Sequence, residues 1–221
     1  MTYKQLEQYL LSISDKKFAD FSKSLSNSEY ISIGVKNPVL REIVKTHIND
    51  EELKLKDFKL GKYLEVDFIY FSLGLSRLKD IDSQLNFLKD KIHLAKSWAI
   101  TDSVSTYIKK LTFEKYWEFY LTMYKSKYTY DRRMSYILGL KLYKDKRILN
   151  ILNYLTYNEE YMVMMAEAWL LATIAINCPN DIYSFLKDCK DITLKRKTIG
   201  KISDSYRFDE VTKNKFKNIR K

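Results

Sequence analysis

A tryptophan and an aspartate stand four residues apart in the segment 97–103, Ser-Trp-Ala-Ile-Thr-Asp-Ser. In an α-helix, residues i and i+4 lie on one face, one turn apart. The indole of Trp98 and the carboxylate of Asp102 would then project together, and both attract a flat cationic ligand. The same spacing also fits a tryptophan packed in a helical core beside an aspartate that faces solvent. The rest of the chain must decide between these two interpretations.

The elements that carry these residues are expected to be helices. The 221 residues include 5 Gly and 2 Pro, which leaves little turn chemistry for a many-stranded β protein. Apolar side chains recur at helical spacing, and no segment shows sustained strand alternation. We therefore predict an all-α protein with helices at residues 3–13, 16–25, 38–45, 60–78, 82–92, 98–103, 113–124, 132–138, 146–155, 159–176, 181–186, 193–202 and 209–219.

One helix boundary can be predicted residue by residue. Asn37 is a good N-cap, and Pro38 is a good first helical residue. The apolar stripe that follows predicts that this helix buries Val39, Leu40, Ile43 and Val44.

Short helices in succession, without a long linker, suggest helical hairpins stacked in one domain over residues 1–221. Arg133 lies 31 residues after Asp102, and Trp169 lies 36 residues after Arg133. These intervals approach the period of roughly 34 to 47 residues of two-helix repeats. Such a solenoid would place equivalent helices side by side, so that these residues line one concave surface.

The charge of the chain favours a polyanionic partner. Its 39 Lys and Arg exceed its 28 Asp and Glu, which gives a net charge of +11 and a pI of about 9.3. Residues 193–221 hold ten basic residues against three acidic ones. This excess fits a phosphate-binding surface, but it also fits a solvated face with a frayed basic tail. Further basic residues near the central helices are Lys109, Lys110, Arg132, Arg133 and Lys141.

Several classes of protein are excluded by what the chain lacks. Cys178, Cys189, His47 and His93 are its only cysteines and histidines, and they assemble no zinc signature, so no metal is expected. The N-terminus shows no signal-peptide pattern, and the longest uncharged run, 168–180, is too short to span a bilayer. We expect a cytoplasmic protein that does not enter a membrane.

Five segments, taken in order, match motifs of a known family. They are 34–41 (Gly-Val-Lys-Asn-Pro-Val-Leu-Arg), 97–103, 132–138 (Arg-Arg-Met-Ser-Tyr-Ile-Leu), 161–169 (Tyr-Met-Val-Met-Met-Ala-Glu-Ala-Trp) and 198–207 (Thr-Ile-Gly-Lys-Ile-Ser-Asp-Ser-Tyr-Arg). Together they resemble the DNA alkylation repair glycosylases of the AlkD-like, HEAT-repeat type. The resemblance covers most of the chain.

The resemblance implies an α-α superhelix of HEAT-like repeats that holds double-stranded DNA on a concave basic face. Such proteins excise cationic N3- or N7-alkylated purines without a metal. No cofactor is expected, and one concave site per chain favours a monomer. Position by position, Asp102 matches the catalytic aspartate, and Trp98 and Trp169 match the aromatic pair beside the lesion. Arg133 matches the arginine near the lesion phosphate, or Arg132 does if the register shifts by one. Lys141 is expected to contribute to the DNA-binding surface.

Two alternatives to a glycosylase stay open at this stage. A noncatalytic member of the family would bind branched or distorted DNA with the same fold and basic face. A helical-repeat scaffold for proteins would instead show little salt-dependent affinity for DNA. Excision and binding assays separate the three functions.

Overall fold

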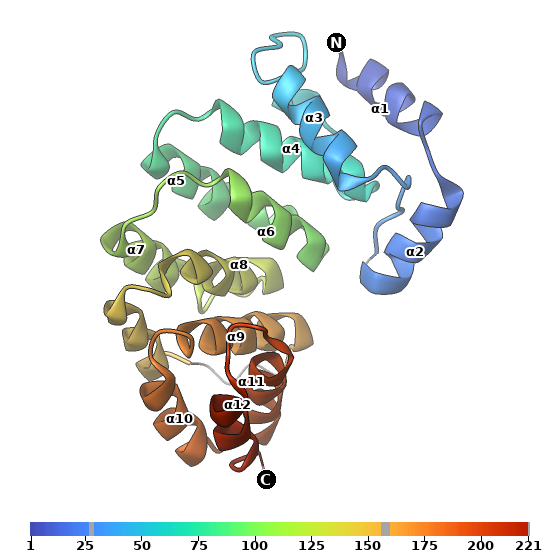
Figure 1. The fold of residues 1–221 in the computed structure, drawn as a ribbon. Coiled ribbons are helices and arrows are strands. Elements are labelled where there is room, and N and C mark those ends of the chain that lie inside the picture. Colours follow the sequence, from blue (N-terminus) through green and yellow to red (C-terminus); the bar gives the residue numbers. More distant parts are fainter. Residues whose placement is uncertain (27–28, 156–159, 221) are drawn as a thin grey trace. The chain divides into compact units, whose positions relative to one another are not determined.

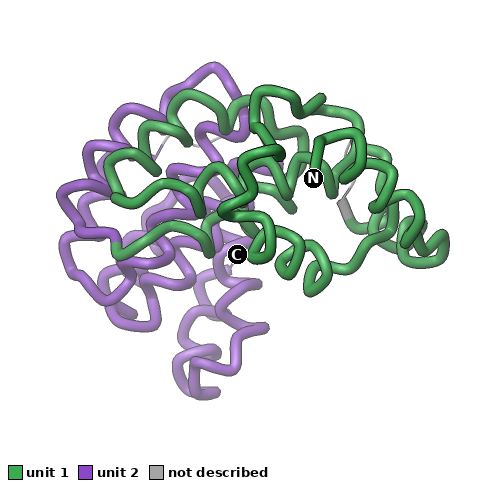
Figure 2. Tube along the Cα trace, turned by 90° about the horizontal axis from the view of Figure 1, so that it is seen from above, with its two compact units in different colours: residues 1–110 green, residues 111–221 purple. Residues whose placement is uncertain are grey.

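The structure is a computed structural model, and it describes residues 1–26, 29–155 and 160–220. Over these residues it contains helices and one isolated parallel bridge between Ile31 and Tyr63, and no strand. The prediction of an all-α protein is therefore confirmed. The chain divides into two compact units, residues 1–110 and 111–221, which Figure 2 colours separately. The sequence predicts a single domain of stacked repeats. This prediction depends on how the two units are joined, so it stays a prediction.

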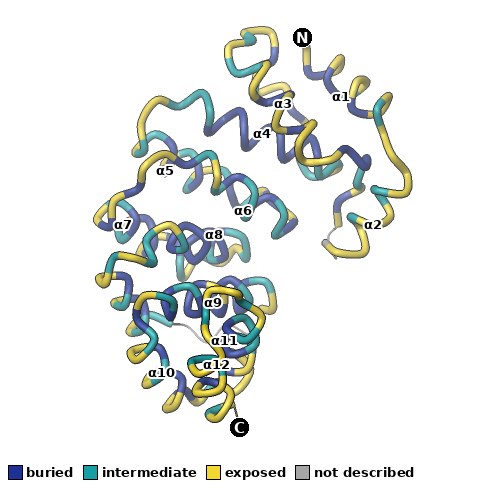
Figure 3. The backbone as a smooth tube through the Cα atoms, viewed as in Figure 1, coloured by how far each residue is buried: buried dark blue, intermediate teal, exposed yellow. Residues whose placement is uncertain are grey.

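The first unit is built around α4, which packs against α3, α5 and α6. Its α4 is buried along most of its length, whereas α2 exposes most of its residues (Figure 3). The helices of this unit, of which Figure 1 labels the α-helices, are α1 (Tyr3–Ser12), α2 (Lys16–Ser26), α3 (Asn37–Thr46), η1 (Leu55–Asp57), α4 (Leu64–Arg77), α5 (Ile81–Lys91), η2 (Ile92–Leu94), α6 (Trp98–Val104) and η3 (Ser105–Tyr107).

In the second unit α9 packs against α8, α10 and α11, while α7 packs against α8 and α12 against α11. Gly139 permits this packing, because a Cβ there would lie 2.6 Å from the Tyr116 hydroxyl and 2.9 Å from a methyl group of Leu170. The helices of this unit are α7 (Phe113–Met123), α8 (Thr129–Gly139), η4 (Leu140–Leu142), η5 (Lys146–Asn153), α9 (Tyr161–Ile174), α10 (Pro179–Asp188), α11 (Ile192–Asp204) and α12 (Glu210–Lys217).

The predicted start of α3 was wrong by one residue. Lys36 is the N-cap, with extended backbone, so Asn37 is already helical and Pro38 follows it. Leu40, Ile43 and Val44 are buried as predicted, but Val39 is 39% exposed. Val39 comes one position before the buried stripe, and a rotation of about 100° per residue turns its side chain toward solvent.

Other boundaries also differ from the predictions. The helix expected at 60–78 begins at Leu64, because Gly61 has a φ of 87° and Tyr63 is an extended N-cap. The helix expected at 146–155 is a 3₁₀-helix, Lys146–Asn153. The expected helix start at Glu159 lies outside the described residues.

Candidate functional site

In the first unit, Trp98 and Asp102 lie on one helix at the spacing that the sequence predicts. Both residues belong to α6, one turn apart, and both are half-buried. Ser97 is the N-cap of α6, and its side chain accepts a hydrogen bond of 3.2 Å from the Ala99 amide. Ile100, Thr101 and Val104 form the buried side of the same helix. The helix therefore packs on residues other than Trp98 and Asp102.

Asp102 accepts a hydrogen bond from its neighbour in the helix. The Thr101 hydroxyl lies 3.1 Å from Oδ1 of Asp102 and 2.9 Å from the carbonyl oxygen of Trp98. One hydroxyl proton serves both acceptors, so each bond is made only part of the time. Thr101 is fully buried, which fixes its hydroxyl beside the carboxylate. This contact restricts the orientation of the Asp102 side chain.

The start of α6 is held by a buried carboxylate from α4. The Tyr30 hydroxyl donates a hydrogen bond of 2.5 Å to Asp67 and accepts one of 3.1 Å from the Lys96 amide. The Gly61 amide also donates to Asp67. Burial raises the pKa of Asp67 to about 6, although the hydrogen bonds from Tyr30 and Gly61 act in the opposite direction. Asp67 thus orients the residue directly before the Ser97 cap.

A second buried carboxylate on α4, Glu65, holds the segment that precedes α3. It accepts hydrogen bonds from the amides of Ile33, Gly34 and Val35 at 2.9, 2.8 and 3.3 Å, and a fourth from the Ser32 hydroxyl. Gly34 has a φ of 91°, a conformation that side chains rarely adopt, and a Cβ there would lie 2.1 Å from the Asp15 carbonyl oxygen. The motif at 34–41 therefore serves to shape this turn.

Neither Glu65 nor Asp67 was predicted to have a role. The signal in the sequence was two acidic residues in the first turn of an otherwise apolar helix. Acidic residues are almost never fully buried unless they are paired, so such acids indicate specific partners. Most of those partners lie 30 to 37 residues earlier in the chain, which local patterns do not reveal.

Arg41 links α3 to the end of α6. Its guanidinium donates a hydrogen bond of 3.0 Å to the Thr106 hydroxyl, which itself donates to the Ser103 carbonyl at 2.7 Å. The same guanidinium lies 5.6 Å from the centroid of the Tyr107 ring. Both ends of α6 are therefore tied to other elements of the first unit.

A small pocket of about 190 Å³ lies beside Trp98 in the first unit. Its walls are largely apolar, and Phe21 and Leu25 of α2 contribute to them while remaining more than half exposed. Glu65 and Ser103 are among its polar lining residues. The pocket places one side of Trp98 against a space that is only loosely covered.

In the second unit, Arg133 and Arg132 have different surroundings. Arg133 is 5% exposed, and its guanidinium donates a hydrogen bond to the carbonyl oxygen of Met162. It therefore joins α8 to the first turn of α9. Arg132 donates to the Ser126 carbonyl at 3.1 Å and forms an ion pair with Glu160, the N-cap of α9. The Arg132 side chain is 17% exposed, so it is the more accessible of the two.

The ion pair with Arg132 also affects Glu160. Burial acts to raise the pKa of this carboxyl group, but hydrogen bonds from Thr129 and Arg132 outweigh it and lower the pKa. Glu160 is thus held in its ionised form, paired with the guanidinium group of Arg132.

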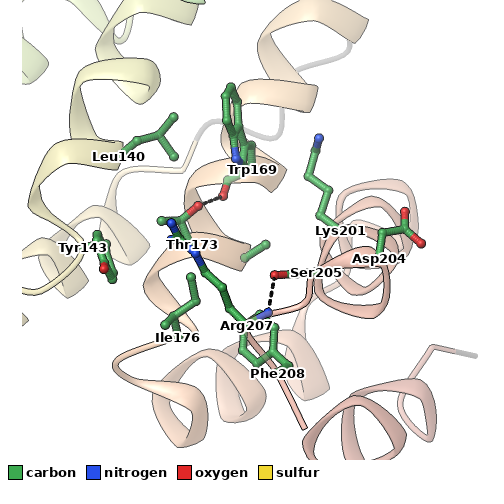
Figure 4. A pocket seen from close by; sticks show the side chains of 11 residues that line it. Leu140, Tyr143, Trp169, Thr173, Ile176, Lys201, Asp204, Ser205, Arg207 and Phe208 are labelled. Carbon is green, nitrogen blue, oxygen red and sulfur yellow. Dashed lines mark hydrogen bonds between the residues drawn. The ribbon is translucent and has the colours of Figure 1, made fainter. Parts of the chain in front are cut away.

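Trp169 lies at the edge of a pocket of about 500 Å³ in the second unit. The tryptophan is 39% exposed, and the ammonium group of Lys201 lies 5.7 Å from its ring centroid. Figure 4 shows Trp169 and Thr173 of α9 between Tyr143 on one side and Lys201 on the other. Lys141 is exposed on η4, and partial desolvation lowers its pKa.

The C-terminal basic residues are not all available to a partner. Lys195 is 8% exposed, and its ammonium group lies 3.4 Å from the Lys187 carbonyl oxygen, so it belongs to the core of the second unit. Lys213 pairs with Glu210 at 3.0 Å. Lys221 lies outside the described residues. The exposed members of the group are Arg196, Arg207, Lys215, Lys217 and Arg220.

Two further findings concern the described part of the chain. No three His, Cys, Asp or Glu side chains there come together in a way that could hold a metal ion. Within the same residues, every helix is too short or too polar to cross a bilayer.

Comparison with known proteins assigns the chain to a family. A search of curated proteins found no match. Residues 6–201, however, match the protein family described as DNA alkylation repair enzyme. The matched range contains α6 with its Trp98 and Asp102, both α8 arginines and Trp169. The chain therefore belongs to the DNA alkylation repair enzyme family.

Proposed function

We propose that the protein is a monofunctional DNA glycosylase, which hydrolyses the N-glycosidic bond of cationic N3- or N7-alkylated purines in duplex DNA. The observation that carries the proposal is the position of Asp102. It stands half-buried, one turn from Trp98, on a helix whose two ends are tied down through Lys96 and Thr106. A carboxylate held in this way can stabilise positive charge that develops next to it.

The chemistry requires only one carboxylate. An alkylated purine already carries a positive charge, so it leaves without protonation by a general acid. Ordinary glycosidases need a second carboxyl group because their leaving oxygen must be protonated. As the bond between the sugar and the purine breaks, its electron pair goes to the purine and neutralises it. Positive charge then builds up on the deoxyribose, where Asp102 stabilises it.

Water completes the reaction at the sugar. Asp102 orients a water molecule, which forms the new bond to the deoxyribose carbon and loses its proton to the carboxylate or to solvent. The products are the free alkylpurine and an abasic site. Trp98 and Trp169 would exclude bulk water and favour the cationic sugar through their ring faces.

Arg132 is the better candidate for the phosphate contact. Arg133 is buried and donates to the Met162 carbonyl, so binding a phosphate would break a bond that joins α8 to α9. Arg132 needs only to exchange Glu160 for a phosphate, and a guanidinium binds both groups in the same bidentate manner. Such a contact would fix the register of the DNA without reading its sequence. Lys141 would add a second, weaker phosphate contact.

The decisive test is release of free 7-methylguanine from methylated duplex DNA, with the wild type and Asp102→Asn compared. Release by the wild type alone supports the proposal. If both proteins release the base equally, Asp102 is not the catalytic group. If neither releases it although both bind DNA tightly, the protein is a noncatalytic DNA-binding member of the family.

A further inference from the structure

The pocket beside Trp169 is formed by three separate segments of the second unit. Tyr143 follows η4, Thr173 and Ile176 lie on or directly after α9, and Lys201 and Asp204 lie on α11. The loop between α11 and α12 closes it with Ser205, Arg207 and Phe208. Its volume of about 500 Å³ is within the range of pockets that bind small organic ligands.

Two of the aromatic rings that line this pocket each lie near a cation. The guanidinium of Arg207 lies 5.8 Å from the centroid of Tyr143, and the ammonium of Lys201 lies 5.7 Å from that of Trp169. Figure 4 shows the Arg207 side chain extending from the loop into the space between Tyr143 and α11. Its backbone is held there, because the Arg207 amide donates a hydrogen bond of 3.2 Å to the Ser205 hydroxyl.

The chemistry of the lining fits a ligand with a flat ring and a phosphate. Aromatic side chains bind nucleobases by stacking, and Lys and Arg bind the attached phosphates. The hydroxyl groups of Thr173 and Ser205 and the carboxylate of Asp204 supply acceptors for exocyclic amino groups. The Asp204 carboxylate repels a phosphate in its immediate vicinity, and Lys201 lies one turn from it on α11 (Figure 4). The phosphate is therefore expected on Arg207.

We propose that this pocket binds one unpaired nucleotide, with its base against Tyr143 and its phosphate on Arg207. The proposal deepens the proposed function, because it rests on DNA as the partner and gives the second unit a site for a nucleotide outside the duplex. A duplex that offers such a nucleotide should therefore bind more tightly than a fully paired one.

The test compares two fluorescein-labelled, unmethylated duplexes by fluorescence anisotropy at one salt concentration. One carries a single bulged deoxyadenosine, and the other is fully paired. Stacking of one base on an aromatic side chain is worth about 1–3 kcal/mol, so the wild type should prefer the bulged duplex by about fivefold or more. Because the DNA is unmethylated, the Asp102→Asn protein should show the same preference whether or not the wild type is a glycosylase.

Two variants remove the proposed contacts. Tyr143→Leu keeps an apolar side chain but removes the ring, and Arg207→Gln removes the charge. Each should bring the ratio of the two affinities close to one. Lys215→Gln is the matched control, since Lys215 lies over the ring of Tyr183 at 4.6 Å outside the pocket. It should weaken both complexes equally and leave the ratio unchanged.

Free deoxyadenosine monophosphate separates the two sources of such a ligand. If the free nucleotide does not abolish the preference for the bulged duplex, the pocket binds a nucleotide that belongs to a DNA strand. If the wild type binds the free nucleotide but shows no preference for the bulged duplex, and Arg207→Gln abolishes this binding, the pocket binds a mononucleotide. The proposal is overturned if the wild type shows neither, or if the preference survives in both pocket variants that retain their fold by circular dichroism.

Discussion

The Tyr30 hydroxyl donates its proton to Asp67 and accepts the amide proton of Lys96, so one side chain joins a buried carboxylate to the start of the helix that carries Asp102. Asp67 has no exposed surface. Burial removes water from the ionised carboxylate and so raises the pKa of Asp67. Because the pKa differs between the folded and unfolded states, the stability of the protein depends on pH.

Asp67→Asn should remove this pH dependence. In the folded protein the pKa of Asp67 is about 6, against an ordinary value of 3.8. Between about pH 4 and 6 the folded state holds a proton that the unfolded state releases, so the contribution of Asp67 to stability falls as pH rises. Asparagine does not titrate. From pH 4 to pH 7 the free energy of unfolding of the variant should therefore gain about 2 kcal/mol relative to that of the wild type.

Urea denaturation at the two pH values measures this change. The comparison uses the difference between variant and wild type, so the titration of other groups cancels. A difference that is the same at pH 4 and pH 7 would show that the folded and unfolded states titrate alike at Asp67.

Gly34→Ala should destabilise the first unit. The alanine would have to adopt a φ of 91° and place its Cβ 2.1 Å from the Asp15 carbonyl oxygen. We expect a loss of about 2–4 kcal/mol in the free energy of unfolding, from backbone strain and displacement of the turn. Gly200→Ala is the matched control, because a Cβ there meets nothing within 4 Å inside α11. It should stabilise the protein by up to about 1 kcal/mol; equal effects of the two changes would contradict the argument.

Asp102→Asn should abolish base release while leaving DNA binding intact. The amide keeps the size of the carboxylate but cannot neutralise positive charge on the deoxyribose. Loss of such electrostatic stabilisation lowers rates by about 10²–10³-fold. Single-turnover release of 7-methylguanine measures the rate, and binding to unmethylated duplex DNA is the control. Asp90→Asn, an exposed acid of the same unit, should retain the full rate.

Glu160→Gln should strengthen DNA binding. The ion pair between Glu160 and Arg132 competes with a phosphate for the same guanidinium. Partly exposed ion pairs are worth about 0.2–1 kcal/mol, so removal of the carboxylate should tighten binding by up to about fivefold. The effect should disappear when Arg132 is also replaced by Gln. Unchanged affinity in the single variant would remove Arg132 from the DNA contact.

The exposed basic residues of the C-terminal segment should contribute to the salt dependence of DNA binding. Each phosphate contact that is lost lowers the slope of log affinity against log salt by about 1. The variant for this test replaces Lys215, Lys217 and Arg220 by Gln. Its control carries the same loss of charge at the exposed positions Lys54, Lys56 and Lys59. If the slope is the same in both triple variants and the wild type, the C-terminal segment does not touch DNA.

The sequence by itself determined the fold class and the pairing on α6. Few Gly and Pro residues, together with apolar residues at helical spacing, predict helices. Both signals are local, because helix propensity and apolar periodicity depend on residues that are close in the sequence. Trp98 and Asp102 lie one turn apart for the same reason, since four residues on any α-helix span about one turn. Helix ends were less well predicted, as Asn37 and Val39 show, because a shift of one residue changes which side chain caps the helix and which one is buried.

The partners of individual side chains were decided only by the tertiary structure. Arg132 and Arg133 are identical in type and adjacent in sequence, yet Arg133 is buried against Met162 whereas Arg132 pairs with the partly exposed Glu160. The same holds for Asp67, whose partner Tyr30 lies 37 residues earlier. Periodicity determines which face of a helix a residue occupies, but packing between segments far apart in the chain determines what that face meets.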